Sequence, residues 1–185
     1  MIMESAMSVQ KLKLKRNHSW KSKPGYSICV LDRGLVRFDY PSAWTVEGKE
    51  GAVYLHDRAN SIESCDLGVS IFRVPPEAAA ALSMEELLLG SLDAERAPYH
   101  QSEIWRSTRE DLEIVWMEEQ YLETSQNRDA RFRVALARGP VICLVSLNYW
   151  TSRAEKLEPV WDHVLNTLQL SSETISDPTR GPVVQ

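Results

Sequence analysis

This 185-residue sequence contains four histidines, and histidine is a common general base and metal ligand near neutral pH. They occupy four different segments and belong to no H-E-x-x-H or H-x-E motif: His18, His56, His100 and His163. In "HDR", residues 56–58, a histidine precedes a carboxylate, as a general base and its orienting group do. The tripeptide follows a predicted strand, which favours a solvated loop. His163 follows Asp162 on the polar side of the last predicted helix, which indicates a surface histidine.

Other catalytic residue types also lack a recognisable arrangement. Cys29, Cys65 and Cys143 form no C-x-x-C pair, so they indicate neither a zinc site nor a disulfide framework. Each lies in an apolar run, where a free cysteine acts as a small core residue. The sequence contains no G-x-S-x-G and no P-loop. We therefore expect no metal, no cofactor and no enzymatic activity.

Carboxylates are concentrated in one segment, and a cation site would require their oxygens to converge. They are Glu110, Asp111, Glu113, Glu118, Glu119 and Glu123. In a strand, residues 113, 119 and 123 share one face and residue 118 lies on the other. The favoured interpretation is a solvated acidic face of a sheet.

Six tryptophans are many for this length, and large aromatic side chains often anchor protein interfaces. The predicted anchors are Trp105, Trp116 and Tyr121, on the strand-like runs "EIWRS" and "LEIVWMEEQYLE". A polar rim is predicted beside them, formed by Arg106, Arg109, Glu118 and Glu119. The alternative is that Trp105 and Trp116 pack beneath helices as core residues.

Short strand-like runs separated by turn sequences predict the sheet that positions these residues. Hairpins are indicated at Asp32-Arg33-Gly34, at "GKEG", at "TRED" and at Arg138-Gly139-Pro140, and hairpins make antiparallel sheet. "LGVSIFRV" is a strand that ends at Pro75-Pro76. "VICLVSL" is apolar on both faces and predicts a central strand. In "RFRVAL", the face that carries Arg131 and Arg133 is expected to be the wetter one.

Two helices are predicted, each behind a capping box. Ser83 and Glu86 open the first, and Ser152 and Glu155 open the second. The apolar residues of the first are Met84, Leu87, Leu88 and Leu92. The stripe of the second comprises Ala154, Leu157, Trp161, Val164, Leu165 and Leu168. Pro159 lies inside that stripe and predicts a kink or a restart of the helix.

The segment "RFDYPSAWTV", residues 37–46, predicts a strand that stops at a proline and a tight turn that brings Trp44 back over the sheet. This F-x-Y-P-x-x-W-x-V pattern and the closing "KLEPVWDHVLNTLQL" resemble the PsbP-like superfamily, which includes Mog-like and DcrB-like proteins. The resemblance spans about residues 26–170. It implies an α/β/α sandwich around an antiparallel sheet and a role in protein binding, and no catalytic motif accompanies it.

Charge is distributed unevenly along the chain. Residues 11–23 hold six lysines and arginines and no acid, whereas the remainder carries a net charge of −11. The overall charge of −5 argues against nucleic acid as the main partner, and no apolar run is long enough for membrane insertion. The N-terminal residues lack the features of a secretory signal, so a cytoplasmic location is expected.

These observations predict one α+β domain over residues 24–170, with an antiparallel sheet of six to eight strands and helices on both faces. Residues 1–23 form a basic arm or an edge strand, and residues 171–185 form a disordered tail. The predicted function is non-enzymatic binding of another polypeptide. Two alternatives remain, a cytoplasmic chaperone for a secreted effector and an enzyme whose site is assembled from scattered residues. An apolar groove would favour the first, and converging histidines and carboxylates would favour the second.

Overall fold

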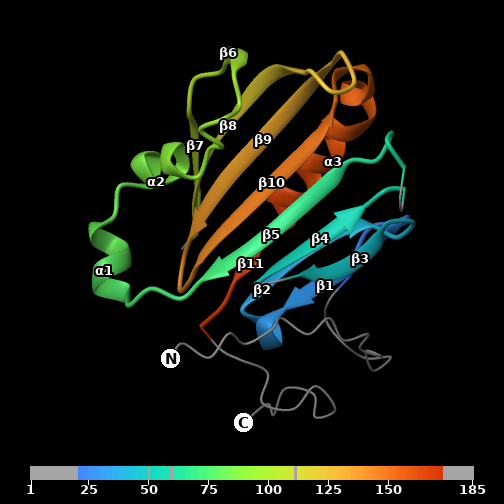
Figure 1. Cartoon of the computed structure of the whole chain (residues 1–185). Helices are drawn as coiled ribbons and strands as arrows, with labels where there is room; N and C mark the ends of the chain where they lie inside the picture. The colour runs from blue at the N-terminus through green and yellow to red at the C-terminus, as the bar shows by residue number, and fades with distance from the viewer. Residues whose placement is uncertain (1–20, 50, 59–60, 111, 173–185) are drawn as a thin grey trace.

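Tight turns join most strands to their neighbours in sequence, so the strands pair in antiparallel fashion (Figure 1). The structure, a computed structural model, describes residues 21–49, 51–58, 61–110 and 112–172. All four predicted hairpins are confirmed. In the second of them Gly51 has φ +81°, a left-handed conformation that glycine adopts without strain.

The large sheet has eight strands. Their spatial order is β3 (Thr45–Lys49), β4 (Ala52–His56), β5 (Asp66–Phe72), β10 (Ile142–Trp150), β9 (Arg128–Arg138), β8 (Leu112–Glu123) and β6 (Pro98–Gln101), with β7 (Trp105–Arg109) also paired to β8. The central position predicted for "VICLVSL" is confirmed, because β10 pairs with β5 on one side and β9 on the other. The strand predicted up to Pro75 ends at Phe72.

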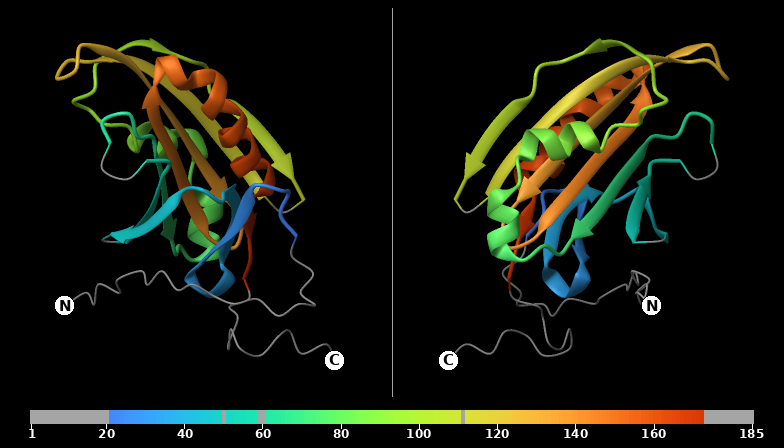
Figure 2. Two further views of the ribbon diagram at one scale, coloured as in Figure 1. Left: turned by 90° about the vertical axis from the view of Figure 1, so that its right-hand side faces the viewer. Right: turned by 60° about the vertical axis from the view of Figure 1, so that its left-hand side comes forward.

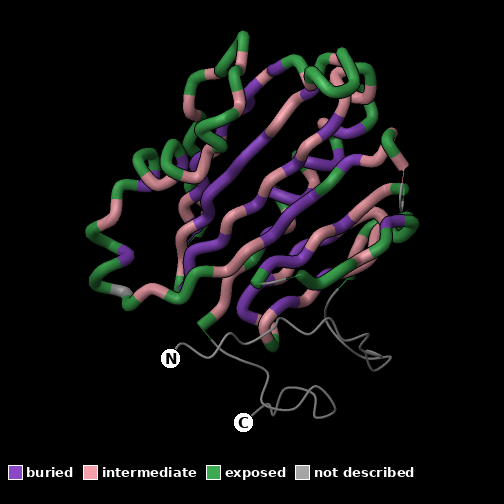
Figure 3. The backbone as a smooth tube through the Cα atoms, in the orientation of Figure 1, coloured by how far each residue is buried: buried purple, intermediate pink, exposed green. Residues whose placement is uncertain are grey.

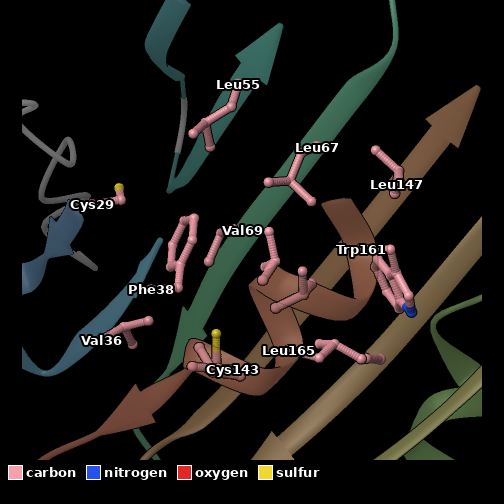
Figure 4. Close-up of a cluster of buried hydrophobic side chains, with 14 of the residues drawn as sticks. Cys29, Val36, Phe38, Leu55, Leu67, Val69, Cys143, Leu147, Trp161 and Leu165 are labelled. Atoms are coloured by element: carbon pink, nitrogen blue, oxygen red, sulfur yellow. The ribbon is translucent and has the colours of Figure 1, made fainter. Parts of the chain in front are cut away.

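A second sheet of three strands accounts for the remaining β-structure of the described residues. It consists of β1 (Tyr26–Leu31), β2 (Val36–Pro41) and the short β11 (Gln169–Leu170), with a 3₁₀ turn η1 (Asp32–Gly34) between β1 and β2. Side chains of this small sheet, such as Cys29 and Phe38, belong to the same core as Leu55 and Val69 of the large sheet (Figure 4). The small sheet therefore packs on one face of the large one.

The turn after β2 connects the two sheets. The backbone N–H of Trp44 donates to the carbonyl of Pro41 at 2.9 Å, and the indole is buried in the core. Strand β3 begins at the next residue. The tight turn and the buried Trp44 predicted from residues 37–46 are confirmed, and the turn moves the chain from one layer to the next.

Helix α3 (Ala154–Thr167) lies on the same face of the large sheet as the small sheet (Figure 2). Its predicted stripe is confirmed, with Leu157, Trp161 and Val164 fully buried. The predicted capping box is wrong, because a 3₁₀ turn η2 (Thr151–Arg153) leads into the helix and the cap residue, Arg153, makes no side-chain cap bond. A restart at Pro159 is also wrong, since α3 is one continuous helix.

The opposite face carries α1 (Pro76–Ala81) and α2 (Met84–Gly90), which come forward in the right-hand view of Figure 2. The predicted cap of α2 is confirmed, with Ser83 Oγ accepting from the N–H of Glu86 at 3.2 Å. Met84 and Leu88 pack on Val134 and Leu136 of the sheet.

Neither face of the large sheet is covered by a complete layer of helices. On one face α3 shares the surface with the small sheet, and on the other the helices overlie only the part near β8 and β9 (Figure 3). The α+β class with antiparallel sheets is established, whereas the α/β/α sandwich is not confirmed. No helix among the described residues has the length and apolarity needed to span a bilayer. The boundaries 24–170 stay a prediction, and residues 1–20 and 173–185 lie outside the described residues.

Candidate functional site

Strand β8 carries most of the predicted site residues and divides them between the two faces. Leu112 and Ile114 belong to the core under α3, whereas Val115 and Met117 belong to the core under α2. Even-numbered residues of β8 therefore face α3 and odd-numbered residues face α2, as the period of a strand requires.

Three tryptophans form a row from the core to the edge of the sheet on the α3 face. The ring of Trp161, fully buried on α3, lies 6.1 Å from that of Trp116 on β8. The ring of Trp116 lies 4.2 Å from that of Trp105 on β7. Trp105 is 36% exposed, so the row ends in solvent at the strand that borders the sheet.

Two further exposed apolar residues lie along the same edge. Leu122 is 45% exposed and pairs in register with Asp129, whose carboxylate accepts from the Tyr99 hydroxyl at 3.3 Å. Tyr99, on β6, is 58% exposed. Half of the six exposed large hydrophobic residues that the described chain contains thus lie at this edge. We call Tyr99, Trp105, Trp116 and Leu122 the edge strip.

The other three predicted site residues lie away from the strip. Arg109 donates to backbone carbonyls at the end of α3, including that of Leu168 at 2.5 Å, and so caps that helix. Arg106 bonds Glu85 at 2.8 Å and Glu113 at 2.6 Å on the α2 side. Tyr121 is buried on that side, where its hydroxyl donates to Asn148 at 2.9 Å. The structure therefore brings together Trp105 and Trp116 but not Tyr121, Arg106 and Arg109.

The solvated acidic face predicted for β8 is wrong. Glu118 is 6% exposed and accepts from Arg133 Nε at 2.6 Å beneath α3. Glu119 is 2% exposed on the opposite face and accepts from Arg96 at 2.9 Å and from Gln101 at 2.7 Å. Arg133 lies directly opposite Glu118 in the pairing of β8 with β9, and Arg96 reaches Glu119 from the segment between α2 and β6.

The Arg131 side of β9 is correspondingly drier than predicted. Arg131 and Arg133 both reach Glu158 of α3, at 2.8 Å and 3.1 Å. Burial favours a raised pKa for Glu118, but hydrogen bonds from Arg133 and Gln120 and the nearby positive charges lower the pKa below its ordinary value. These ion pairs connect β8, β9 and α3 inside the protein.

The two histidine expectations are also wrong. His56 lies between carboxylates, with Nδ1 2.6 Å from Asp66 and Nε2 3.6 Å from Glu47. The following Asp57 is not in a solvated loop, because its carboxylate forms an ion pair with Arg153 and accepts from the Cys65 N–H at 3.0 Å. The ring of His163 packs edge-on against Tyr26, with Nε2 3.5 Å from Asp39, so it is largely covered. His100 is exposed on β6, and His18 lies outside the described residues.

The cysteines are buried, as predicted for core residues. Burial raises the pKa of the Cys143 thiol to about 12, so it is protonated at neutral pH and a poor nucleophile. Within the described residues, no three histidine, cysteine, aspartate or glutamate side chains are placed to hold a metal ion.

Solved structures that superimpose on this chain identify the type of fold. Cyanobacterial PsbP (CyanoP) from Synechocystis sp. PCC 6803 superimposes with a TM-score of 0.54 at 14% identity, over 85% of this chain and 100% of that one. A Bacteroides thetaiotaomicron structure gives a TM-score of 0.56 at 13% identity over 82% of this chain, which spans 50% of the length of that protein. PA94 from Pseudomonas aeruginosa gives 0.50 at 15% identity, over 80% and 99%. The fold is PsbP-like, as the sequence resemblance predicted.

The family follows from sequence. The profile of the Alr1449 family matches residues 27–174. A Nostoc protein (strain PCC 7120), named "Uncharacterized protein alr1449", is 32% identical over 173 residues, which are 92% of this chain and 90% of that one. This chain belongs to the Alr1449 family.

Sequence reasoning missed Tyr99 and Leu122. Leu122 lies in the predicted strand "LEIVWMEEQYLE", at an even position that shares the face of Trp116. The alternation of side chains along a strand was the signal that could have placed Leu122 on the same face as Trp116. No such signal was available for Tyr99, because the register of β6 shifts between Pro98 and His100.

Proposed function

We propose that the protein binds another polypeptide along the edge strip and catalyses no reaction of its own. The observation that carries the proposal is the row from Trp161 through Trp116 to Trp105, which places a supported aromatic ring at an open sheet edge. A cytoplasmic place of action is part of the proposal and stays a prediction from the sequence.

The edge itself suits an extended partner segment. Among the described residues, strand β7 pairs with β8 alone, and all residues of β7 except Arg109 are exposed. An edge strand offers unpaired backbone N–H and C=O groups to which a further strand can add. Main-chain hydrogen bonds then supply affinity, and side-chain pockets supply specificity.

The aromatic row supplies a rigid anchor for such a segment. Interface hot spots are typically Trp, Tyr or Arg residues held in well-packed surroundings. The ring of Trp105 lies tilted against that of Trp116, which in turn packs on the fully buried ring of Trp161. Little side-chain entropy of Trp105 should therefore be lost when a partner covers it. Leu122 and Tyr99 extend the apolar contact towards the far end of β8.

The competing functions fit the described residues less well. A chaperone for apolar helices needs a continuous apolar groove, whereas the edge strip is interrupted by the polar residues Glu118 and Gln120. An enzyme needs converging titratable groups. His56 does meet carboxylates in one pocket, which is the specific observation in favour of that class.

Site-specific photo-crosslinking tests the proposal. A photoreactive residue at Ser107, in the middle of β7, should crosslink one polypeptide in cells, and Trp105→Ala should reduce the yield by about tenfold or more, as loss of a hot spot does. The matched control is Phe72, an exposed apolar residue at the end of β5, which lies between β4 and β10 in the large sheet. Crosslinking from position 72 should recover no such partner, and Phe72→Ala should leave the yield at Ser107 unchanged.

The bound segment should also be shown to add to the sheet. A synthetic peptide covering the crosslinked stretch should slow amide hydrogen exchange in β7 but not in β3, the strand at the other edge of the large sheet. Equal crosslinking from positions 107 and 72, or a partner that leaves β7 exchange unchanged, would contradict the proposal. Turnover of a substrate by the Trp105→Ala variant at the wild-type rate would place the function elsewhere.

A further inference from the structure

A pocket of about 800 Å³ lies on the face of the large sheet opposite α3, beyond the region that α2 covers. Its floor is formed by strand residues, among them Asp66 of β5 and Asn148 of β10. Residues of β3, of the segment 61–64 and of the turn between β8 and β9 surround it. This volume is within the range of pockets that hold metabolite-sized ligands.

The floor presents polar groups in fixed positions. His56, Asp66 and Asn148 are direct cross-strand neighbours on β4, β5 and β10. His56 Nδ1 lies 2.6 Å from Asp66, and Asn148 Oδ1 accepts from the Tyr121 hydroxyl at 2.9 Å. Side chains held by strands and by each other are preorganised for binding.

One side of the pocket is apolar. Trp150 and Ile62 line it, and the indole N–H of Trp150 donates to the carbonyl of Ile62 at 2.7 Å. Ile62 is 58% exposed. An exposed isoleucine beside an aromatic ring provides a surface for the apolar part of a ligand.

The charged groups decide which kind of ligand fits. Carboxylates reach the pocket from three separate strands, as Glu47, Asp66 and Glu123. Lys49 is the only lysine or arginine among the lining residues, and its ammonium group is already paired with Glu47 at 3.2 Å. The lining residues thus carry more carboxylates than ammonium groups, although Asp66 and Glu47 also contact His56 and the guanidinium of Arg128 lies 4.4 Å over the Trp150 ring. This excess of carboxylates favours a cation over an anion.

We propose that this pocket binds a small organic cation, an amine with an apolar or aromatic body. The ammonium group lies against Asp66 and Glu47, and the body lies against Trp150 and Ile62. This site is on the other face of the sheet from the edge strip, and it does not depend on the proposed polypeptide binding.

Three probes with the same body and different head groups test the inference. They are 2-phenylethylamine, 2-phenylethanol and 3-phenylpropionate, added to ¹⁵N-labelled full-length protein. The amine should cause saturable shifts of the Trp150 indole and of the Asp66 and Asn148 amides, with an affinity at least tenfold above those of the alcohol and the carboxylate. An alcohol that binds as tightly as the amine would overturn the proposal, as would an amine without saturable shifts at these residues.

Variants separate the pocket from general surface charge. Asp66→Asn and Glu47→Gln should each weaken amine binding about tenfold. Glu47 is exposed on the edge strand β3, so its variant is expected to fold even if Asp66→Asn does not. Asp162→Asn, on the exposed side of α3, is the matched control and should leave the affinity unchanged. An equal loss in Asp162→Asn would refute the site, while the crosslinking from β7 should be the same in all of these proteins.

Discussion

The two faces of the large sheet are covered to different extents by elements that meet the same strands. On the α3 face, the helix and the small sheet bury a core that includes Trp161, Leu157 and Phe38. On the other face, α2 covers only the part near β8 and β9, and the remainder forms the open pocket. The stability of the fold is therefore expected to depend mainly on the first face, which leaves side chains of the second free for binding.

Adjacent residues of β8 show the same difference at the level of single charges. Glu118 pairs with Arg133, which projects from the central part of β9 and is covered by α3. Glu119 pairs with Arg96, which lies in the segment between α2 and β6 with its guanidinium over the rings of Tyr121 and Phe132. Arg133 also contacts Glu158 of α3 at 3.1 Å, whereas among the described residues Arg96 forms an ion pair with Glu119 alone.

The largest effect is expected for Trp161→Ala. The indole is fully buried between α3 and the sheet, so its removal should lower the free energy of unfolding by about 3–5 kcal/mol. Chemical denaturation measures this directly. Trp105→Ala, at the exposed end of the same row, is the control and should cost no more than about 1 kcal/mol. Equal losses in the two variants would show that burial does not set the contribution of each tryptophan in this row to stability.

The next largest effects on the free energy of unfolding are expected for substitutions of the adjacent residues Glu118 and Glu119. Glu119→Gln removes the one carboxylate that pairs with the largely buried Arg96 among the described residues, and loss of one partner of a buried pair costs about 3 kcal/mol. Glu118→Gln should cost about half as much, because Glu158 remains 3.1 Å from Arg133. Denaturation midpoints of the two variants and of the double variant test this. A larger loss for Glu118→Gln would mean that Glu158 does not compensate the charge of Arg133.

Acid titration sharpens the same comparison. The folded pKa of Glu118 is below its ordinary value of 4.5, so the folded state holds this proton less tightly than the unfolded chain. The resulting stabilisation is complete above the unfolded pKa and is lost as the pH falls through the folded pKa. Wild-type protein should therefore lose more stability than Glu118→Gln when the pH is lowered from 6 to about 3. Parallel acid profiles of the two proteins would contradict this assignment.

The hairpins and the last helix could be predicted because they depend on local sequence. The turn at "GKEG" places a glycine where a left-handed φ is needed, and the stripe of residues 157–168 has the period of a helix. The turn from Pro41 to Trp44 was predicted for the same reason. The capping box at Ser152 failed because the η2 turn takes the place of the expected helix start.

The partners of the charged residues could not be predicted. Arg96 and Glu119 are 23 residues apart, and Arg109 meets the end of α3 from 59 residues away at its farthest contact. Strand parity correctly separated Glu118 from Glu119, but it gave no indication that each would be buried against an arginine. The division of the strands into two sheets was also missed, because hairpin patterns do not say which hairpins pair with each other.

The smallest effect is expected for a methyl group added at Gly68, a buried position on the face of the large sheet opposite α3. Gly68 lies on β5, and a Cβ there would come within 2.9 Å of Ser146 Oγ and 3.4 Å of the Tyr54 ring. Both neighbours are side-chain atoms, and Ser146 Oγ can rotate away. Replacement of a strand glycine also removes conformational freedom from the unfolded chain, which favours the folded state.

Gly68→Ala should therefore change the free energy of unfolding by less than about 1 kcal/mol, because the two contributions oppose each other. Ala137→Val is the matched control, since it adds bulk to a fully buried position under α3 and should cost about 1–3 kcal/mol. Thermal and chemical unfolding of the two variants can be compared side by side. If Gly68→Ala proves as costly as Ala137→Val, the sheet face opposite α3 is packed as tightly around Gly68 as the core is around Ala137.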